Sequence, residues 1–270
     1  MLSDQRRAEM AEWICREGKA DITELAEYFQ VSGETVRRDL NVIADGKKIR
    51  KVHGGAIAPR PPVRDESYAE RLVHNSYHKK KIGEYAVRFL ENNDVIAIDA
   101  GTNAECFAES IYHIQNLKII TYSLPVASIL SRKLTAGDFT GSVILTGGKL
   151  NPETQTVYGA EALSELQRYR VNKAFLSATA VDETGVMSWT EDDGLLTAAL
   201  LSHADRAYVL AESDKLDRQS FFRIASFQGI NALITDGKQP ASDALKKALK
   251  ESSAELCIAD RAGEAGEEKQ

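Results

Sequence analysis

Cysteine is scarce in this sequence, and its few positions exclude two common kinds of site. Cys15, Cys106 and Cys257 are odd in number and far apart. They therefore form neither a disulfide framework nor the paired spacing of a zinc site. We expect three reduced, buried thiols in a cytoplasmic protein, with no metal and no cofactor.

Long apolar runs are also missing. No segment approaches the roughly 20 apolar residues that a membrane-spanning helix needs, and no apolar stretch follows the polar N-terminus as it would in a secretory signal. Hydrophobic residues still make up 43% of the 270 positions, which is ordinary for globular proteins. The sequence therefore predicts no membrane partner and two soluble domains of unequal size.

A general excess of positive charge, which would suit a partner rich in phosphate, is absent. The formal net charge is −6. Residues 35–60, however, hold 7 Lys and Arg against 2 Asp and Glu, a net charge of +5, whereas residues 61–270 hold 23 against 30, a net charge of −7. This uneven distribution predicts one local contact with a phosphate backbone near the N-terminal end.

The segment 31–40, Val-Ser-Gly-Glu-Thr-Val-Arg-Arg-Asp-Leu, contains the clearest functional pattern. Ser32 is a good N-cap for a helix. Val36, Leu40 and Ile43 recur at helical spacing, so we expect them on the buried face. The other sides of this helix hold four polar side chains, Thr35, Arg37, Arg38 and Asn41. Such a helix fits a DNA major groove, although an ordinary amphipathic helix with two solvated arginines has the same pattern.

The preceding segments favour the DNA-binding alternative. A first helix is expected at 3–17, with an inner stripe of Ala8, Ala11, Ile14 and Cys15. A second is expected from an acidic capping box at Asp21 and Glu24 to about residue 29, with Leu25, Ala26 and Phe29 facing inward. Two helices joined by a tight turn at 30–31 form a helix-turn-helix.

Residues 47–57, Lys-Lys-Ile-Arg-Lys-Val-His-Gly-Gly-Ala-Ile, predict a basic two-stranded ribbon. Ile49 and Val52 suit the strands, and Gly54-Gly55 can supply a turn with positive φ. A cationic ribbon beside the helix would form a winged helix that contacts phosphates or a minor groove.

These two motifs together resemble the DeoR family of bacterial transcriptional regulators, which shows a Val-Ser-x-x-Thr-[Ile/Val]-Arg-Arg-Asp-Leu helix and a His-Gly-Gly-Ala wing. The resemblance covers nearly all of residues 5–57. It implies that double-stranded operator DNA contacts Ser32, Thr35, Arg37, Arg38 and His53. The polar helix face and the basic ribbon add Asn41, Arg50 and Lys51.

The proposed domain organisation follows from composition. Residues 1–57 form the winged helix-turn-helix domain. The proline-rich stretch 59–62 marks an extended linker over residues 58–77, and residues 65–77 can be helical. Residues 78–258 form the larger domain, and the polar tail 259–270 should be disordered.

The larger domain alternates apolar strands with helices, which predicts an α/β fold with a mainly parallel sheet. The helix at 78–90 opens with a basic run at 78–81 that we expect to be solvated. The expected strands are 95–98, 117–120, 142–145, 174–176, 207–210, 232–234 and 255–258. The other expected helices lie near 104–113, 125–134, 160–169, 191–203 and 241–251.

Small and polar residues follow several of these strands, and ligands of such sheets bind at the carboxyl ends of strands. Asp99, Gly101, Thr102 and Asn103 follow the first strand and lead into a helix N-terminus, a plausible phosphate cradle. The next strands are followed by further small or polar residues, which include Thr121, Gly147, Gly148 and Lys215. Each turn alone is ordinary, but together at one edge they favour a single polar-ligand site.

The family resemblance continues through this domain to about residue 258. It implies a fold similar to sugar-phosphate isomerases and a phosphorylated sugar or related metabolite as effector, with Asp99, Gly101, Thr102, Gly147, Gly148, Asp182 and Lys215 in matching places. We add Glu191, at the start of the helix near 191–203. Asn103 stands where Thr is usual and Tyr122 where Asn is usual, and a Lys-Arg pair is absent after Glu191. The pocket is therefore expected to be altered.

The favoured function is a transcriptional regulator, and we expect it to repress a carbohydrate operon. We expect it to act as a homodimer or homotetramer on symmetric operators. One alternative is a sugar-phosphate isomerase or hydrolase fused to the DNA-binding module, with Asp182, Glu191 and Lys215 as candidate acid and base groups. Another is an architectural DNA-binding protein whose second domain only oligomerises.

Overall fold

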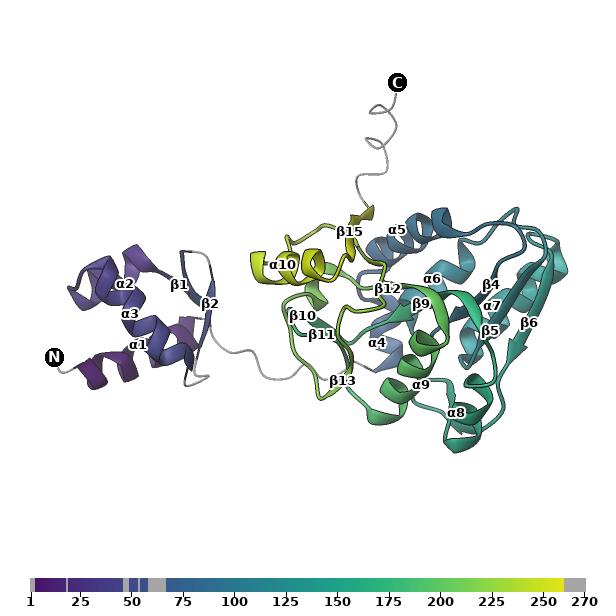
Figure 1. Ribbon diagram of the computed structural model, residues 1–270, viewed down its shortest axis with the longest axis horizontal. Coiled ribbons are helices and arrows are strands. Elements are labelled where there is room, and N and C mark those ends of the chain that lie inside the picture. The colour runs from purple at the N-terminus through teal and green to yellow at the C-terminus, as the bar shows by residue number, and fades with distance from the viewer. Residues whose placement is uncertain (1–2, 18, 46–48, 53, 58–66, 260–270) are drawn as a thin grey trace, which may run out of the picture. The chain divides into compact units, whose positions relative to one another are not determined.

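The structure is a computed structural model of the chain that describes residues 3–17, 19–45, 49–52, 54–57 and 67–259. It divides into two compact units, Met1–Pro61 and Pro62–Gln270, which are treated separately below (Figure 1). The proline-rich stretch 59–62, His53 and the tail 260–270 lie outside the described residues.

The first unit is a small helical domain with a three-stranded sheet. Its helices are α1 (Ser3–Glu17), α2 (Ile22–Phe29) and α3 (Gly33–Asp45), and its strands are β1 (Lys19–Asp21), β2 (Arg50–Val52) and β3 (Gly55–Ile57). The strands pair in the antiparallel order β1-β3-β2. The predicted two-stranded ribbon is present. The third strand, β1, was not predicted, because it is three residues long and lacks an apolar pattern.

The inner face of α1 differs from the predicted stripe. Met10, Ala11 and Ile14 are buried, whereas Ala8 and Cys15 are exposed. The helix is thus rotated so that the large Met10 side chain fills the core and the two small side chains face solvent. The expectation of three buried thiols is wrong for Cys15, only partly met by Cys106 and confirmed for Cys257. Cys106 is half-buried and Cys257 is buried.

The two glycines of the ribbon have different roles. Gly54 has a φ of +85° with open space around its Cα, so it supplies the turn. Gly55 lies so near β1 that a Cβ would come within 2.1 Å of the Ala20 carbonyl oxygen. The pair therefore permits both the reversal and the close approach of a third strand.

The second unit has a seven-stranded, wholly parallel sheet in the order β15-β14-β12-β9-β4-β5-β6. All seven predicted strands belong to it. They are β4 (Val95–Ile98), β5 (Leu117–Thr121), β6 (Gly141–Leu145), β9 (Val171–Ser177), β12 (Ala204–Leu210), β14 (Ala232–Thr235) and β15 (Glu255–Ile258).

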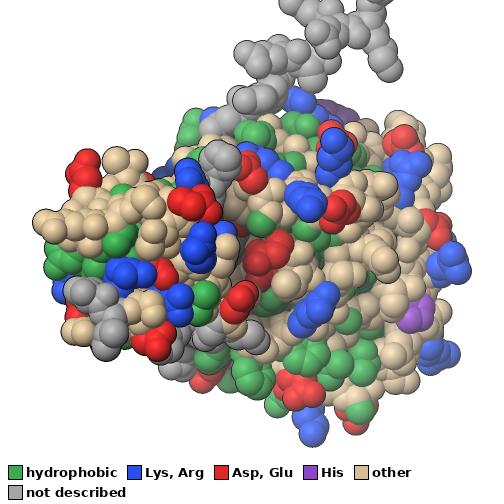
Figure 2. Space-filling model, turned by 60° about the vertical axis from the view of Figure 1, so that its left-hand side comes forward, with side chains coloured by type: hydrophobic (Ala, Val, Ile, Leu, Met, Phe, Trp, Pro, Cys, Tyr) green, Lys and Arg blue, Asp and Glu red, His purple; other side chains and the backbone are tan. Residues whose placement is uncertain are grey.

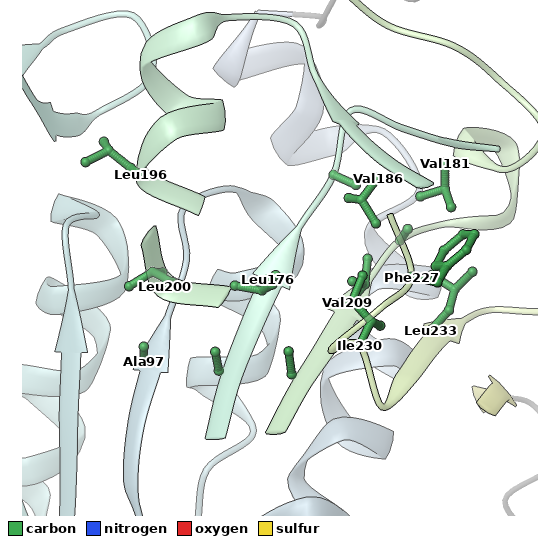
Figure 3. Packing of buried hydrophobic residues seen from close by; sticks show 14 of the residues in the cluster. Ala97, Leu176, Val181, Val186, Leu196, Leu200, Val209, Phe227, Ile230 and Leu233 are labelled. Carbon is green, nitrogen blue, oxygen red and sulfur yellow. The ribbon is translucent and has the colours of Figure 1, made fainter. Parts of the chain in front are cut away.

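Helices cover both faces of this sheet, and each face has its own apolar cluster. On one face Leu196 and Leu200 of α9 (Glu191–Ser202) belong to the same apolar cluster as strand residues such as Leu176 and Val209, and Leu200 lies beside Leu176 (Figure 3). This face is completed by α8 (Ala160–Leu166) and α10 (Asp243–Glu251). The opposite face carries α5 (Ser76–Ala86), α6 (Thr102–Glu109) and α7 (Leu124–Ala136). Burial on both faces explains why the strands read as continuous apolar runs.

Several short helices and strands of the second unit were not predicted from the sequence. They are α4 (Tyr68–Val73), within a stretch where only a helix of unspecified bounds was expected, the hairpin of β7 (Lys149–Asn151) with β8 (Thr156–Tyr158), and a small sheet of β10 (Ala180–Asp182), β11 (Gly185–Ser188) and β13 (Phe222–Ala225). The helix expected at 78–90 is α5 followed by a 3-10 turn at Val87–Phe89.

The basic run at the start of α5 was expected to be solvated, but this expectation is wrong for Lys79. Lys79 is 2% exposed, and its Nζ lies 3.3 Å from Oε1 of the equally buried Glu212. Acidic and basic side chains are otherwise interspersed on the face that Figure 2 presents, without one large patch of a single sign. None of the helices in the described parts of the chain combines the length and the apolar character that a membrane crossing requires.

Candidate functional site

The first candidate site is the polar face of α3. Ser32 accepts a hydrogen bond from the Thr35 N–H at 3.2 Å, and Ser32 Oγ lies 2.9 Å from Thr35 Oγ1. Val36, Leu40 and Ile43 are buried, as predicted. The outward positions place Arg37, Arg38 and Asn41 at the surface, with Thr35 half-buried. The helix therefore presents donors and cations while its other side anchors it in the core.

Asp39 points the other way from its neighbours Arg37 and Arg38. It is 2% exposed, and its two oxygens accept from Arg6 Nε at 2.7 Å and from Arg7 Nε at 2.8 Å. Burial by itself would raise the pKa of Asp39, but the hydrogen bonds from Arg6 and Arg7 outweigh it and hold that pKa below its usual value. Asp39 therefore fixes α3 against α1.

The ribbon contributes to the same region. Lys51 of β2 donates from its Nζ to the Oδ1 of Asn41 on α3, so these two predicted contacts lie together. Arg50 belongs to β2, while the predicted contact His53 lies outside the described residues.

The second candidate site is a pocket in the larger unit that opens to solvent. It collects residues that follow the carboxyl ends of β4, β9 and β12, the N-terminal turn of α6 and the first turn of α9. Its wall is formed by Arg71, Asp99, Ala100, Gly101, Thr102, Asn103, Tyr122, Thr154, Thr156, Ser177, Ala178, Thr179, Ser188, Asp193, Thr197, Lys215 and Ile224.

Asp99 is held in this pocket by several hydrogen bonds. It is buried and accepts from the N–H groups of Ala100 and Ser177, at 2.9 and 2.8 Å, and from the hydroxyls of Tyr122 and Thr197. Burial raises its pKa to about 6 against the opposing effect of these donors. Burial likewise raises the pKa of Tyr122 well above its ordinary value, with the Asp99 charge adding to it. Asp99 thus braces β4, β9 and α9 beneath the pocket.

The loop after β4 has the geometry of a cradle. Gly101 is the N-cap of α6 with a φ of +104°, and a Cβ built there would meet nothing closer than Ser177 Oγ at 3.5 Å. The first N–H groups of α6 have no partner within the helix, because of their position in its first turn. Together with the helix dipole they favour an anion.

A buried polar cluster lies beside this cradle. Asn103 donates to Glu212 at 2.7 Å, and Glu212 lies 3.3 Å from both Lys79 and Lys215. Although burial would raise the pKa of Glu212, the charges of Lys215 and Lys79 lower it to about 2. Lys215 also donates to the Ala178 carbonyl at 3.0 Å.

Asn103 and Ser177 place buried polar atoms in the pocket wall. Asn103 Oδ1 and Ser177 Oγ are buried and make no hydrogen bond with any part of the chain that the structure describes. Buried polar atoms are rarely left unpaired in folded proteins. A ligand with hydroxyl groups could satisfy both atoms.

The pocket brings together five of the ten predicted effector residues, namely Asp99, Gly101, Thr102, Asn103 and Lys215. The other five do not line it. Thr121 accepts from the Ser123 N–H within its own turn, and the Gly147 N–H donates to Glu165. Gly148 lies against the Tyr158 carbonyl of the β7–β8 hairpin.

The remaining two, Asp182 and Glu191, were also candidate acid and base groups of an enzyme. Asp182 is buried and accepts from Thr184 at 2.8 Å and from Gln219 at 2.7 Å. Glu191 is exposed at the start of α9. Only Lys215 of the three nominated groups lies in the pocket, so they do not form one catalytic cluster.

Sequence reasoning missed most of the remaining wall. Arg71 lies on the short α4, and Thr154 and Thr156 lie in or beside the β7–β8 hairpin, neither of which has a strong pattern. Tyr122 was noticed only as a bulky departure from the family. Its hydroxyl position next to Asp99 depends on the pairing of β4 with β5, which no local motif reveals.

Comparison with known proteins covers both units. Residues 6–61 match the DeoR-like helix-turn-helix domain, and residues 74–237 match the DeoR C-terminal sensor domain. The chain is 33% identical over 244 residues to an uncharacterized HTH-type transcriptional regulator of Bacillus subtilis, YulB, covering 90% of this chain and 92% of that protein.

Two further relatives carry functional names. The chain is 29% identical to the HTH-type transcriptional repressor GlcR of Bacillus subtilis, over 87% of this chain and 89% of the relative. It is 27% identical to the glycerol-3-phosphate regulon repressor of Escherichia coli, over 90% and 94%. Among solved structures, a D-ribose-5-phosphate isomerase in complex with phospho-erythronic acid aligns over 52% of this chain and 54% of its own, with 14% identity and a TM-score of 0.39.

Proposed function

The chain belongs to the DeoR family of transcriptional regulators, and from that premise we propose that it is a repressor of a carbohydrate operon. It binds double-stranded operator DNA through α3 and the β2–β3 ribbon. A phosphorylated sugar or related metabolite in the pocket of the larger unit relieves repression. The relatives named as repressors support this sign of regulation.

The DNA contact is supported by the exposed side chains of α3. Arg37, Arg38 and Asn41 are exposed and can face a groove, because Val36 and Leu40 take the opposite, buried side. Lys51 beside Asn41 adds a cation for the phosphate backbone. Arg50 and His53 remain proposed contacts of the ribbon.

The proposed effector class rests on buried polar atoms of the pocket wall that lack hydrogen-bond partners among the described residues and lie next to a helix N-terminus. Asn103 Oδ1 and Ser177 Oγ lack partners, while Gly101 opens the first turn of α6 to an anion. Hydroxyl groups and a phosphate on one small molecule would satisfy both features. A phosphorylated sugar or polyol has this chemistry.

We further propose that the larger unit oligomerises the chain and that the pocket does not catalyse a reaction. A two-fold symmetric operator favours a homodimer or a homotetramer. The separation of Asp182 and Glu191 from Lys215 argues against the isomerase or hydrolase alternative, because acid and base groups must reach the same substrate.

DNA binding is tested by selection of duplexes from a random pool with the purified full-length chain. Fluorescence anisotropy then compares a selected duplex with a scrambled one at the same salt concentration. We expect specific binding to exceed non-specific binding by at least about 10³-fold. Equal affinity for both duplexes would contradict a sequence-specific regulator.

Effector binding is tested by thermal shift with pairs of compounds that differ only in phosphate. Glycerol 3-phosphate with glycerol and glucose 6-phosphate with glucose are suitable pairs, and inorganic phosphate controls for the anion alone. At least one phosphate ester should stabilise the protein and release the selected duplex. Detection of product from the same esters would instead support the enzyme.

A further inference from the structure

We propose that Arg71 on α4 contacts the anionic group of the effector directly, so that α4 responds to occupancy of the pocket. This inference rests on the proposed effector site and deepens it, because it assigns the anion contact to a residue outside the Gly101–Asn103 loop. In sequence, α4 is the first described helix after the β2–β3 ribbon. Its position makes it the natural start of any signal to the DNA-binding unit.

Charges of both signs line the pocket wall. The wall holds two cationic side chains, Arg71 and Lys215, and two carboxylates, Asp99 and Asp193. Lys215 Nζ lies 3.3 Å from Glu212 and donates to the Ala178 carbonyl. Arg71 interacts electrostatically with Glu105 of α6, the helix whose first turn forms the cradle. An anion that enters beside these carboxylates requires a cation to offset them, and Arg71 is the other cationic side chain among the described wall residues.

An arginine suits this contact better than a lysine. The planar guanidinium can donate two parallel hydrogen bonds to a phosphate, whereas an ammonium acts as a point charge. Arg71 is half-buried in the pocket wall, where weaker screening strengthens such bonds. The first turn of α6 and the guanidinium would then bind one anionic group between them.

The attachment of α4 makes it responsive. This helix of six residues, Tyr68–Val73, has no buried residue of its own. Tyr68 donates to Glu105 of α6 at 3.1 Å, and Lys79 donates to the carbonyls of Arg71 and His74 at its C-terminal end. A helix attached mainly by polar contacts opens more easily than one anchored in a core.

Both attachments also lead to the pocket. Glu105 lies on α6, whose N-terminus forms the cradle. Lys79 lies 3.3 Å from Glu212, and Glu212 accepts from Asn103 in the pocket wall. An effector that engages Arg71 and Asn103 therefore acts on α4 at its side chain and through its C-terminal anchor. A ligand shifts a conformational equilibrium only through such differential contacts.

The test uses the full-length protein with Arg71→Ala and Arg71→Lys. Arg132→Ala is the matched control, because Arg132 is an exposed arginine of α7 that pairs with Glu109 and does not line the pocket. Calorimetric titration measures the affinity of each protein for glycerol 3-phosphate, glucose 6-phosphate, glycerol and glucose. Circular dichroism and operator affinity without effector verify the fold.

For whichever ester binds the parent, Arg71→Ala should raise the dissociation constant at least about tenfold and Arg71→Lys by less. Affinity for the matching alcohol should stay unchanged, so the preference for the ester over the alcohol falls. Arg132→Ala should behave as the parent does. At saturating ester, the Arg71→Ala protein should retain more operator than the parent.

Two results would overturn the inference while leaving the proposed function intact. One is an unchanged preference for the ester in a folded Arg71→Ala protein. The other is an equal loss of ester and alcohol binding in both Arg71 variants, which indicates a structural role. If neither ester binds the parent, the proposed effector class is wrong and the inference falls with it. If Arg71→Ala does not fold, the ester preference of Arg71→Lys tests the inference instead, because lysine keeps the positive charge but cannot donate two parallel hydrogen bonds.

Discussion

Asp39 of α3 and Arg6 of α1 form an ion pair in which Arg6 Nε lies 2.7 Å from Asp39 Oδ2. Arg38, the residue before Asp39, is exposed. Within one short motif, therefore, Arg37 and Arg38 stay at the surface while the aspartate orients the helix that carries them. Arg7, at 2.8 Å from the other carboxylate oxygen, completes this attachment.

Asp39→Asn should destabilise the first unit by roughly 1–3 kcal/mol, because two charge-assisted hydrogen bonds are weakened and Arg6 and Arg7 lose their counter-charge. The free energy of unfolding from urea titration of the full-length chain measures this. Asp45→Asn, an exposed position at the end of the same helix, is the control. Equal stability of the two variants would contradict the role of Asp39.

The same ion pair predicts an acid-sensitive first unit. The pKa of Asp39 is lower in the folded state than its model-compound value of 3.8, so its contribution to stability is present above pH 3.8 and is lost as the pH falls through the lower, folded value. Asp39→Asn should therefore unfold with less dependence on pH below about 4 than the parent. Circular dichroism during acid titration measures the difference.

Arg38→Ala should weaken operator binding by about 1–3 kcal/mol if its guanidinium contacts a base edge. Arg16→Ala is the control, since Arg16 is an exposed arginine of α1 that pairs with Glu17. Anisotropy titration with selected and scrambled duplexes at fixed salt separates the effects. A base contact predicts a larger loss for the selected duplex, whereas a phosphate contact lowers both affinities alike.

Tyr122→Phe should destabilise the second unit by about 1–3 kcal/mol, because Asp99 loses a buried donor. Asp99 has a folded pKa of about 6, above its ordinary 3.8, so its proton-linked stability is present below pH 3.8 and is lost as the pH rises through about 6. Since the Tyr122 hydrogen bond lowers that pKa, the variant should lose more stability at pH 7 than at pH 5.

Urea unfolding at both pH values measures this effect of Tyr122→Phe. Tyr112→Phe provides the control, because Tyr112 is 48% exposed and its ring stacks under the Lys133 ammonium, a contact that phenylalanine retains. A Tyr122→Phe protein with the same loss at both pH values would show that Asp99 does not titrate in this range.

Gly101→Val should abolish the response to effector without unfolding the protein. The positive φ strains any side chain at this position by about 1–3 kcal/mol, and the branched group would occupy the cradle. Gly137→Val carries the same kind of strain, since Gly137 caps α7 with a φ of +79° in open space away from the pocket. Operator release against phosphate-ester concentration compares the two variants.

A Gly101→Val protein that is folded and responds at the parent's ester concentration would place the effector elsewhere. Operator affinity without ester should equal that of the parent in both glycine variants, because α3 and the ribbon are unchanged. A loss of basal affinity in the Gly101 variant alone would mean that this loop supports the DNA-binding state even when the pocket is empty.

Local patterns were sufficient for much of the fold. The helical spacing of Val36, Leu40 and Ile43 identifies the buried face of α3, and the Asp21 carboxylate does cap α2 through the Glu24 N–H. All seven apolar runs became strands of the parallel sheet. These features depend on neighbouring residues and on burial at both faces, which a sequence records directly.

Pairing of distant segments was beyond the sequence. The three residues of β1 form a strand only because Gly55 lets β3 approach. Lys79 belongs to a run of basic residues that looks solvated in the sequence, and only the fold places Glu212 beside it. The fate of Cys15 depended on the rotation of α1 about its axis. In each case the contact that decides the outcome joins residues that are not related by the spacing of a single helix or strand.

The candidate site divides in the same way. The sequence by itself predicted that the loop at Gly101–Asn103 lines the pocket, because a strand, a glycine and a helix start follow one another there at the carboxyl edge of a parallel sheet. Only the tertiary structure added Arg71, Ser177 and Thr197 and removed Thr121 and Asp182 from the wall. A pocket is a meeting of chain segments, and which side chains enter it depends on strand order and helix rotation rather than on the residues next to them.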